Sequence, residues 1–380
     1  MSTRGRLREA GEEDAIVERY LDFYVAMCER SIEGGLRRLV YWLDWLESEI
    51  DNIRLALQRC SATKDFARGT AISGGAGWYW MTRATAEGVR WLDEFLPAEA
   101  GEAGARAQAY FTRGFLATLQ SDIAAADPAL ERAVDLARET GRTRLAVQAL
   151  CTASIEMDFK GDTARGQQLL EEATLETSRI DDPAATAALL QARDNRAFAT
   201  GDAAAAVPFA TESVRIARET DNVYALEYGL LHLGFAGIFL GDPAQARDRF
   251  AEALRIARQI DDRLAEFYIL SALAAVAVGL GDAPLSARLL GAADSVRKGA
   301  GASLSVMLAQ LLAASEEAAI AALGRSKFDL EFNAGSQMSR DAAIVLALGE
   351  KEENRPPARR AATGRSGSAS RMLRGSSPTA

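Results

Sequence analysis

Apolar residues recur at helical spacing along most of the chain, and short polar breaks separate the helical stretches at a constant interval. Gly-Asp pairs stand 40 residues apart at Gly161-Asp162, Gly201-Asp202, Gly241-Asp242 and Gly281-Asp282, with a degenerate copy at Ser121-Asp122. A fixed period of this length is typical of proteins built from stacked repeats. The pattern therefore predicts a solenoid, an architecture that offers partners a long surface.

The unit around Gly241 indicates how each repeat is built. Gly241 suits a helix end that needs positive φ, Asp242 can cap the next helix, and Pro243 then takes the first helical position. A second break divides each unit into two helices, at Gly141, Asp181-Asp182, Asp221-Asn222 and Asp261-Asp262. Because the acidic pairs Asp181-Asp182 and Asp261-Asp262 recur at one phase of the repeat, we interpret them as helix starts rather than as cation ligands.

The same unit resembles a tetratricopeptide repeat. Ala246, Phe250, Ala253 and Ala257 share one helical face, and together with Leu233-Gly234 they stand at the offsets of that repeat. Its usual length is about 34 residues, so a 40-residue unit implies longer helices. We therefore expect an all-α protein whose residues 105–300 form a right-handed α-solenoid of about five helical hairpins.

The segments on either side of the repeats predict helical caps. In residues 20–104, a stripe of Leu43, Leu46, Ile50, Ile53 and Leu57 and the sequence around Trp78-Tyr79-Trp80 predict a packed helical block that covers the first repeat. Residues 74–77 are glycine-rich, but no Lys follows them, so we expect them to allow close helix packing rather than to bind phosphate. Residues 301–349 are expected to form C-terminal capping helices.

Several short sequence motifs in these flanks resemble the C-terminal half of bacterial STAND-class regulators. The helix in residues 42–57 resembles their "WL..L..E.DN.R.AL", residues 287–293 their "A.LLGAA", and residues 334–343 their last helix. The resemblance implies a helical-repeat sensor, which in that family follows an NB-ARC-like ATPase and a winged helix. Many members also carry a LuxR-type or OmpR-type DNA-binding domain.

The chain departs from this family in two ways. It contains no G-x-x-x-x-G-K-[ST] sequence, which an ATPase of this class needs to bind phosphates. Residues 1–19 resemble only the exit linker of the winged helix, and no second DNA-binding motif follows residue 348. We therefore expect either a fragment of a longer regulator or a stand-alone sensor half.

Charge and composition disfavour DNA and membranes as partners. Residues 351–380 carry a net charge of +5, which leaves −14 for the rest of a chain whose total is −9. An acidic body is a poor match for phosphates, and we expect the Arg-, Pro- and Ser-rich tail at 350–380 to be disordered. Without a long apolar run or a signal sequence, and with three scattered cysteines, the chain is expected to be cytoplasmic.

Catalytic chemistry has little support in the sequence. His232 is the only histidine, so a Ser-His-Asp arrangement or a metal site would have to depend on it. We expect no enzyme activity, no cofactor and no metal, and a structural or groove-lining role for His232.

Recognition is the remaining function. In tetratricopeptide arrays the first helix of each hairpin lines the concave groove, and this resemblance places eleven side chains there: Gln108, Phe111, Phe115, Gln148, Cys151, Gln191, Asn195, Tyr228, Leu231, Phe235 and Tyr268. Aromatic and amide groups of this kind suit a peptide or a protein helix. For Phe111, Phe115, Leu231 and Phe235, packing between repeats is an equal alternative.

We expect a non-catalytic module that binds a protein, a peptide or a small-molecule inducer, and that serves a STAND-type regulator within one chain or in trans with an ATPase-bearing relative. One alternative is a DNA-binding transcriptional regulator in its own right. Another is an accessory scaffold subunit of a signalling enzyme such as a cyclase or kinase.

Overall fold

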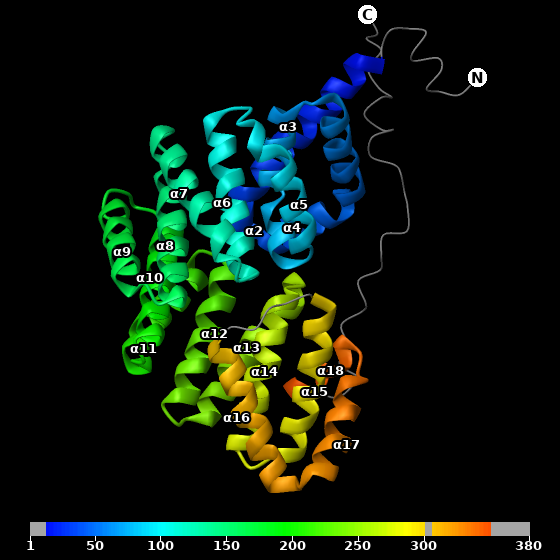
Figure 1. Ribbon diagram of the computed structural model, residues 1–380, viewed down its shortest axis with the longest axis vertical. Coiled ribbons are helices and arrows are strands. Elements are labelled where there is room, and N and C mark those ends of the chain that lie inside the picture. The colour runs from blue at the N-terminus through cyan, green and yellow to red at the C-terminus, as the bar shows by residue number, and fades with distance from the viewer. Residues whose placement is uncertain (1–12, 301–305, 351–380) are drawn as a thin grey trace, which may run out of the picture.

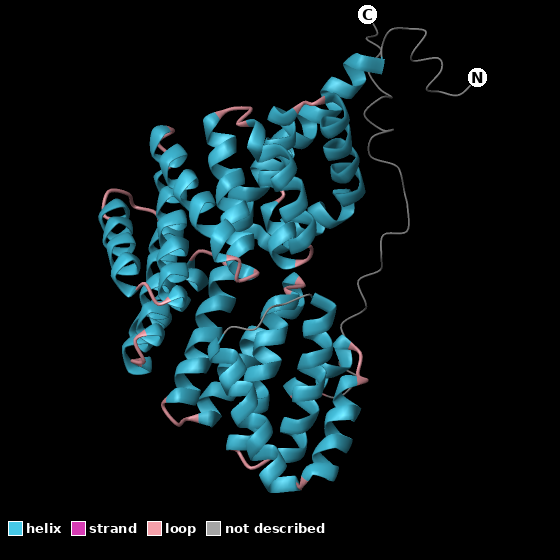
Figure 2. Cartoon of the chain, viewed as in Figure 1, coloured by secondary structure: helices cyan, strands magenta, loops and turns pink. Residues whose placement is uncertain are grey.

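The structure is a computed structural model that describes residues 13–300 and 306–350, and every regular element in these ranges is a helix. Figures 1 and 2 show the helices stacked side by side along a curved path. The prediction of an all-α repeat protein with helical caps is therefore confirmed.

Five helical hairpins make up the repeat region, and both helices of each hairpin begin 40 residues after their counterparts in the hairpin before. The first helices, here called the inner helices, are α6 (Ala103–Leu119), α8 (Thr143–Lys160), α10 (Pro183–Ala199), α12 (Val223–Phe239) and α14 (Arg263–Gly279). The second, or outer, helices are α7 (Ile123–Glu139), α9 (Thr163–Thr177), α11 (Ala203–Glu219), α13 (Pro243–Ile260) and α15 (Ala283–Ala300). Neighbouring helices in this series pack on one another.

The recurring polar breaks end one helix and cap the next, as the sequence predicts. Gly241 has φ +77°, and the degenerate copy Ser121 adopts the same left-handed region with φ +56°. Asp242 then caps α13 by accepting a hydrogen bond from the backbone N–H of Gln245 at 3.0 Å. Such a cap satisfies an amide that the helix leaves unpaired. The second break at Asp261-Asp262 behaves in the same way, since Asp261 has φ +58° and Asp262 caps α14.

Small and large residues alternate between the two helices of a hairpin. Ala246, Phe250, Ala253 and Ala257 of α13 are all fully buried. A Cβ atom at Gly234 of α12 would lie 2.5 Å from the ring of Phe250, so glycine is needed where that ring packs. The predicted buried face of α13 is confirmed.

An N-terminal block precedes the repeats, and its first element folds back on itself. The long helix α2 (Glu13–Thr63) breaks at Arg38, where φ is −136° and ψ is +47°. The hydroxyl of Tyr24 donates to Glu49 across the two arms at 2.7 Å, so they run antiparallel as a hairpin. Beside the bend, a Cβ atom at Gly34 would lie 1.7 Å from the indole of Trp42, which only glycine avoids. The block continues with α3 (Phe66–Gly75), α4 (Gly77–Thr82), α5 (Thr85–Phe95) and η1 (Leu96–Ala98).

The N-terminal block covers the first repeat, as predicted, because α3 and α5 pack on α6. A Cβ atom at Gly74 would lie 2.7 Å from the backbone of Ala109, so the glycine-rich stretch allows close helix packing. The block also makes a contact that the sequence analysis does not foresee. At the bend of α2, Leu39 and Leu43 are fully buried together with Ile260, at the end of α13.

This second contact, here called the closure contact, brings the bend of α2 against Ile260, which lies more than 200 residues further along the chain. It includes an ion pair in which Arg83 Nε lies 3.4 Å from a carboxylate oxygen of Asp261. The arc of repeats therefore returns to the N-terminal block and surrounds a central space (Figure 1).

The C-terminal helices α16 (Val306–Leu323), α17 (Arg325–Ser336) and α18 (Arg340–Leu348) cover the last repeat. Helix α17 approaches α15 so closely that a Cβ atom at Gly291 would lie 2.0 Å from the carbonyl oxygen of Phe332. From α18, Arg340 pairs with the fully buried Glu266 of α14. Residues 1–12 and 351–380, which hold most of the predicted linker and the predicted tail, lie outside the described residues.

Candidate ligand-binding cavity

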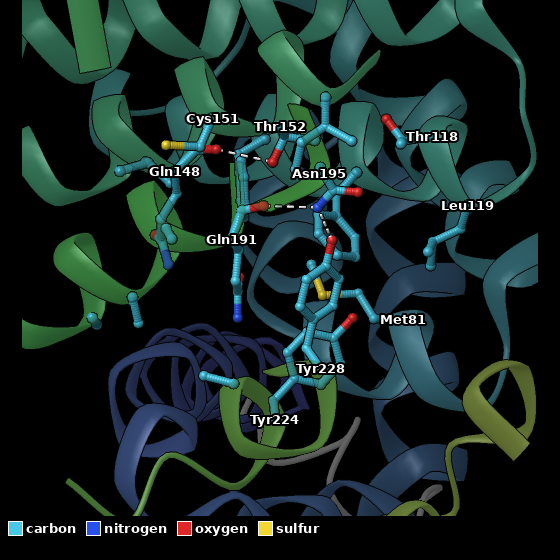
Figure 3. A pocket seen from close by; sticks show the side chains of 18 of the residues that line it. Met81, Thr118, Leu119, Gln148, Cys151, Thr152, Gln191, Asn195, Tyr224 and Tyr228 are labelled. Atoms are coloured by element: carbon cyan, nitrogen blue, oxygen red, sulfur yellow. Dashed lines mark hydrogen bonds between the residues drawn. The ribbon is translucent and has the colours of Figure 1, made fainter. Parts of the chain in front are cut away.

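The central space is a cavity of about 1890 Å³ that all five inner helices line together with the first arm of α2. Figure 3 shows side chains from α8, α10 and α12 converging on it. Pockets for small molecules are typically about 300–1,000 Å³. The cavity is therefore large enough for a peptide segment.

The structure places every predicted groove residue in the wall of this cavity. They are Gln108, Phe111 and Phe115 on α6, Gln148 and Cys151 on α8, Gln191 and Asn195 on α10, Tyr228, Leu231 and Phe235 on α12, and Tyr268 on α14. Phe111 is 8% exposed and Phe235 is 3% exposed, so both are mainly part of the core between repeats. Phe115 and Leu231 are half-buried and present more of their surface to the cavity.

Amide groups form the middle of the wall. The Asn195 side chain donates to the backbone carbonyl of Gln191 at 2.8 Å and also contacts the hydroxyl of Tyr228. These contacts fix Asn195 between α10 and α12, while Gln148 and Gln191 extend into the space from α8 and α10 (Figure 3). Fixed and movable amides together can pair with the backbone of an extended peptide.

His232 takes part in the same wall. Its ring stacks on Tyr228, with the ring centroids 4.2 Å apart. Its Nδ1 atom lies 2.9 Å from Oδ1 of Asp194, but the two groups are not aligned as a hydrogen bond. Asp194 is fully buried, and burial raises the pKa of its carboxyl, an effect that His232 partly offsets. The arrangement matches the groove-lining role expected of this histidine.

The wall is acidic. Ten of the lining residues are Asp or Glu and three are Arg, so the cavity favours a ligand with positive charge. The three arginines are already paired. Arg144 contacts Glu33 of α2 and Asp182, each at 2.6 Å, while Arg142 lies 3.4 Å from Glu29 and Arg68 pairs with acidic residues nearby. These pairs also tie α2 to the start of α8.

Two buried carboxyl groups stand out where α12 and α14 begin. Glu227 is 3% exposed, and its Oε1 atom has no hydrogen-bond partner. Burial raises the pKa of Glu227 well above its usual range, and the neighbouring charges of Asp262 and Glu266 raise it further. Burial likewise raises the pKa of Asp262 to about 7, although the α14 backbone N–H groups that it caps act in the opposite direction. Carboxyl groups perturbed in this way gather at functional sites.

An apolar rim lies at the opposite ends of the inner helices. Phe159 and Phe239 lie in the last turns of α8 and α12, and Leu240 follows α12 directly. All three line the cavity and are 48–60% exposed. Large apolar side chains clustered at a cavity rim mark places where partners bind. The cavity therefore combines an acidic end with an apolar end.

The sequence analysis missed several lining residues. Trp78 and Tyr224 meet at 5.5 Å between ring centroids, on opposite sides of the junction between the N-terminal block and α12. No local pattern predicts that they meet. A signal for Glu227 was available, because it is the one acidic residue in the otherwise apolar α12.

Other kinds of site have less support within the described ranges. No group of three or more His, Cys, Asp or Glu side chains there is placed to hold a metal ion. None of the described helices combines the length and apolarity needed to cross a membrane. Cys28, Cys60 and Cys151 are free and buried, and burial raises the pKa of the Cys151 thiol to about 12.

No protein-family model matches the chain, and no curated protein does. The cavity itself is therefore the basis for a functional proposal.

Proposed function

We propose that this chain is a non-catalytic binding module whose central cavity takes an elongated ligand, such as a peptide or a segment of a partner protein. The observation that carries the proposal is the shared wall: five inner helices contribute amide and aromatic side chains to one cavity of about 1890 Å³. A small-molecule inducer of comparable size would use the same wall.

The resemblance of the flanks to STAND-class regulators extends this proposal to a biological role. In such a regulator the module would act as the sensor, and ligand binding would change how it contacts an ATPase in the same chain or in a relative. The closure contact supports this role, because it links the cavity wall to the N-terminal block on which an upstream domain would act.

Random-peptide phage display against the purified chain, followed by fluorescence anisotropy with the selected peptides, tests the proposal. Gln191→Trp fills the cavity from α10, whereas Gln168→Trp adds the same ring to the exposed face of the outer helix α9. We expect Gln191→Trp to weaken binding by about tenfold or more and Gln168→Trp to leave it unchanged. Equal binding by the two variants would locate the ligand elsewhere. Tight, sequence-selective DNA binding in a mobility-shift experiment would instead favour a DNA-binding regulator.

A further inference from the structure

The junction between the N-terminal block and α12 carries a more specific inference, which rests on the proposed function. At this junction Tyr224 faces Trp78 at 5.5 Å and Phe115 at 6.5 Å between ring centroids. All three residues line the cavity. They form an aromatic cluster where the cavity meets the closure contact.

Glu227 lies on the same face of α12 as this cluster. It follows Tyr224 by three residues, a spacing that makes two side chains neighbours on a helix. It lines the cavity, is 3% exposed and has an oxygen without a hydrogen-bond partner. A buried carboxyl oxygen without a partner destabilises the folded chain, and a bound donor removes that cost.

We propose that Glu227 and the aromatic cluster of Trp78, Phe115 and Tyr224 bind an ammonium or guanidinium group on an otherwise apolar ligand. A carboxylate and an aromatic face are the two protein groups that attract organic cations most strongly. A basic residue in a peptide and a free amine both offer this chemistry.

The surroundings of Glu227 make cation binding depend on pH. Asp262 and Glu266 of α14 face it with like charge, and Glu266 is itself paired with Arg340 of α18. Tyr224 and Tyr228, on its own helix, and Tyr268 of α14 line the cavity beside it, and Arg83 of the N-terminal block pairs with Asp261. Because a cation favours ionised carboxyl groups, binding releases protons and tightens as pH rises.

The experiment compares two peptides that differ only in charge. Isothermal titration uses Phe-Arg-Phe and Phe-citrulline-Phe, each with blocked ends, since citrulline has the shape of arginine without its charge. We expect the intact chain to prefer the arginine peptide by about tenfold. Phenethylamine, with phenethyl alcohol as its neutral counterpart, tests the free amine as the source of the cation.

Glu227→Gln keeps the shape of the side chain and is expected to abolish the preference for the charged probes. Glu212→Gln, on the outer helix α11, where the side chain is 45% exposed and does not line the cavity, is the matched control and should keep the preference. The preference should also grow as pH rises, both in the unmodified chain and in Glu212→Gln, but not in Glu227→Gln. Equal affinity for charged and neutral probes, failure of all charged probes to bind, or an unchanged preference in Glu227→Gln would each overturn the assignment. In those cases the proposed cavity function still stands if peptides selected at random lose affinity with Gln191→Trp.

Discussion

The inner and outer helices of the hairpins differ in how their charged side chains are paired. On the outer helices, Arg138 of α7 pairs with Glu172 and Glu176 of α9, and Arg218 of α11 pairs with Glu252 of α13. On the inner helices, Glu227 keeps an unpaired oxygen in a buried wall, and so does Asp194. Every 40-residue repeat contains one inner and one outer helix, so the period by itself does not explain why the pairing of their charged side chains differs. Among the described residues, the buried carboxyl oxygens without a partner belong to Asp158, Asp194 and Glu227 of the inner helices, whereas the outer helices leave only the hydroxyls of Ser213 and Ser286 unpaired. Unpaired buried carboxyl groups are costly, so this contrast supports the proposal that the inner face binds a ligand.

The largest expected effect comes from a substitution that removes packing between an inner and an outer helix. Phe250 of the outer helix α13 is fully buried against Gly234 of the inner helix α12. Phe250→Ala should lower the free energy of unfolding by about 3–5 kcal/mol, because it leaves a cavity between the helices. Leu175→Ala on α9, where the side chain is 57% exposed, is the control and should change stability by less than about 0.5 kcal/mol. Urea denaturation followed by circular dichroism measures both.

A pH titration of stability tests the buried carboxyl groups of the inner face. The folded state raises the pKa of Asp262 from 3.8 to about 7, so it binds this proton more tightly than the unfolded state does. Stability should therefore fall as pH rises from about 4 to about 7, by about 3 kcal/mol for this group. Asp262→Asn retains an oxygen that can cap α14 and should flatten this slope. Asp242→Asn, at the solvent-exposed cap of α13, should leave the slope as it is; if both variants behave alike, burial of Asp262 is not its cause.

The closure contact joins both kinds of helix to the N-terminal block, since the bend of α2 packs on the inner helix α12 and on Ile260 at the end of the outer helix α13. Leu39→Ala removes the apolar group that α2 buries beside Ile260 and should cost about 2 kcal/mol. Hydrogen exchange should then become faster at the start of α12 and at the bend of α2, while α9 is unchanged. Tyr41→Ala, two residues away and 50% exposed, is the control. Uniform acceleration throughout the chain would mean that the contact is part of one global core.

Local chemistry explains what the sequence could predict. The phase of the 40-residue repeat gives the helix starts, because each start needs a capping side chain and a residue that tolerates positive φ. The resemblance to tetratricopeptide repeats predicts that the first helix of each hairpin lines the groove, and it therefore predicts Gln191 and Asn195 there. The closure contact could not be predicted, because nothing near Leu39 specifies a partner at Ile260. The environment of Glu227 likewise could not be predicted, because helices from different parts of the chain form it. Only the position of Glu227 as the one acidic residue of α12 indicated a special role.

The smallest expected effect concerns the ion pairs of the outer helices. Arg218 and Glu252 lie 2.6 Å apart, but their side chains are 49% and 40% exposed, so water and salt screen their attraction. A double-mutant cycle with Arg218→Ala and Glu252→Ala should give a coupling energy of about 0.2–1 kcal/mol, and less in high salt. Neither change should alter peptide binding to the cavity. A loss of binding comparable to that of Gln191→Trp would show that the outer helices also take part in recognition, and the contrast between the two faces would then no longer hold.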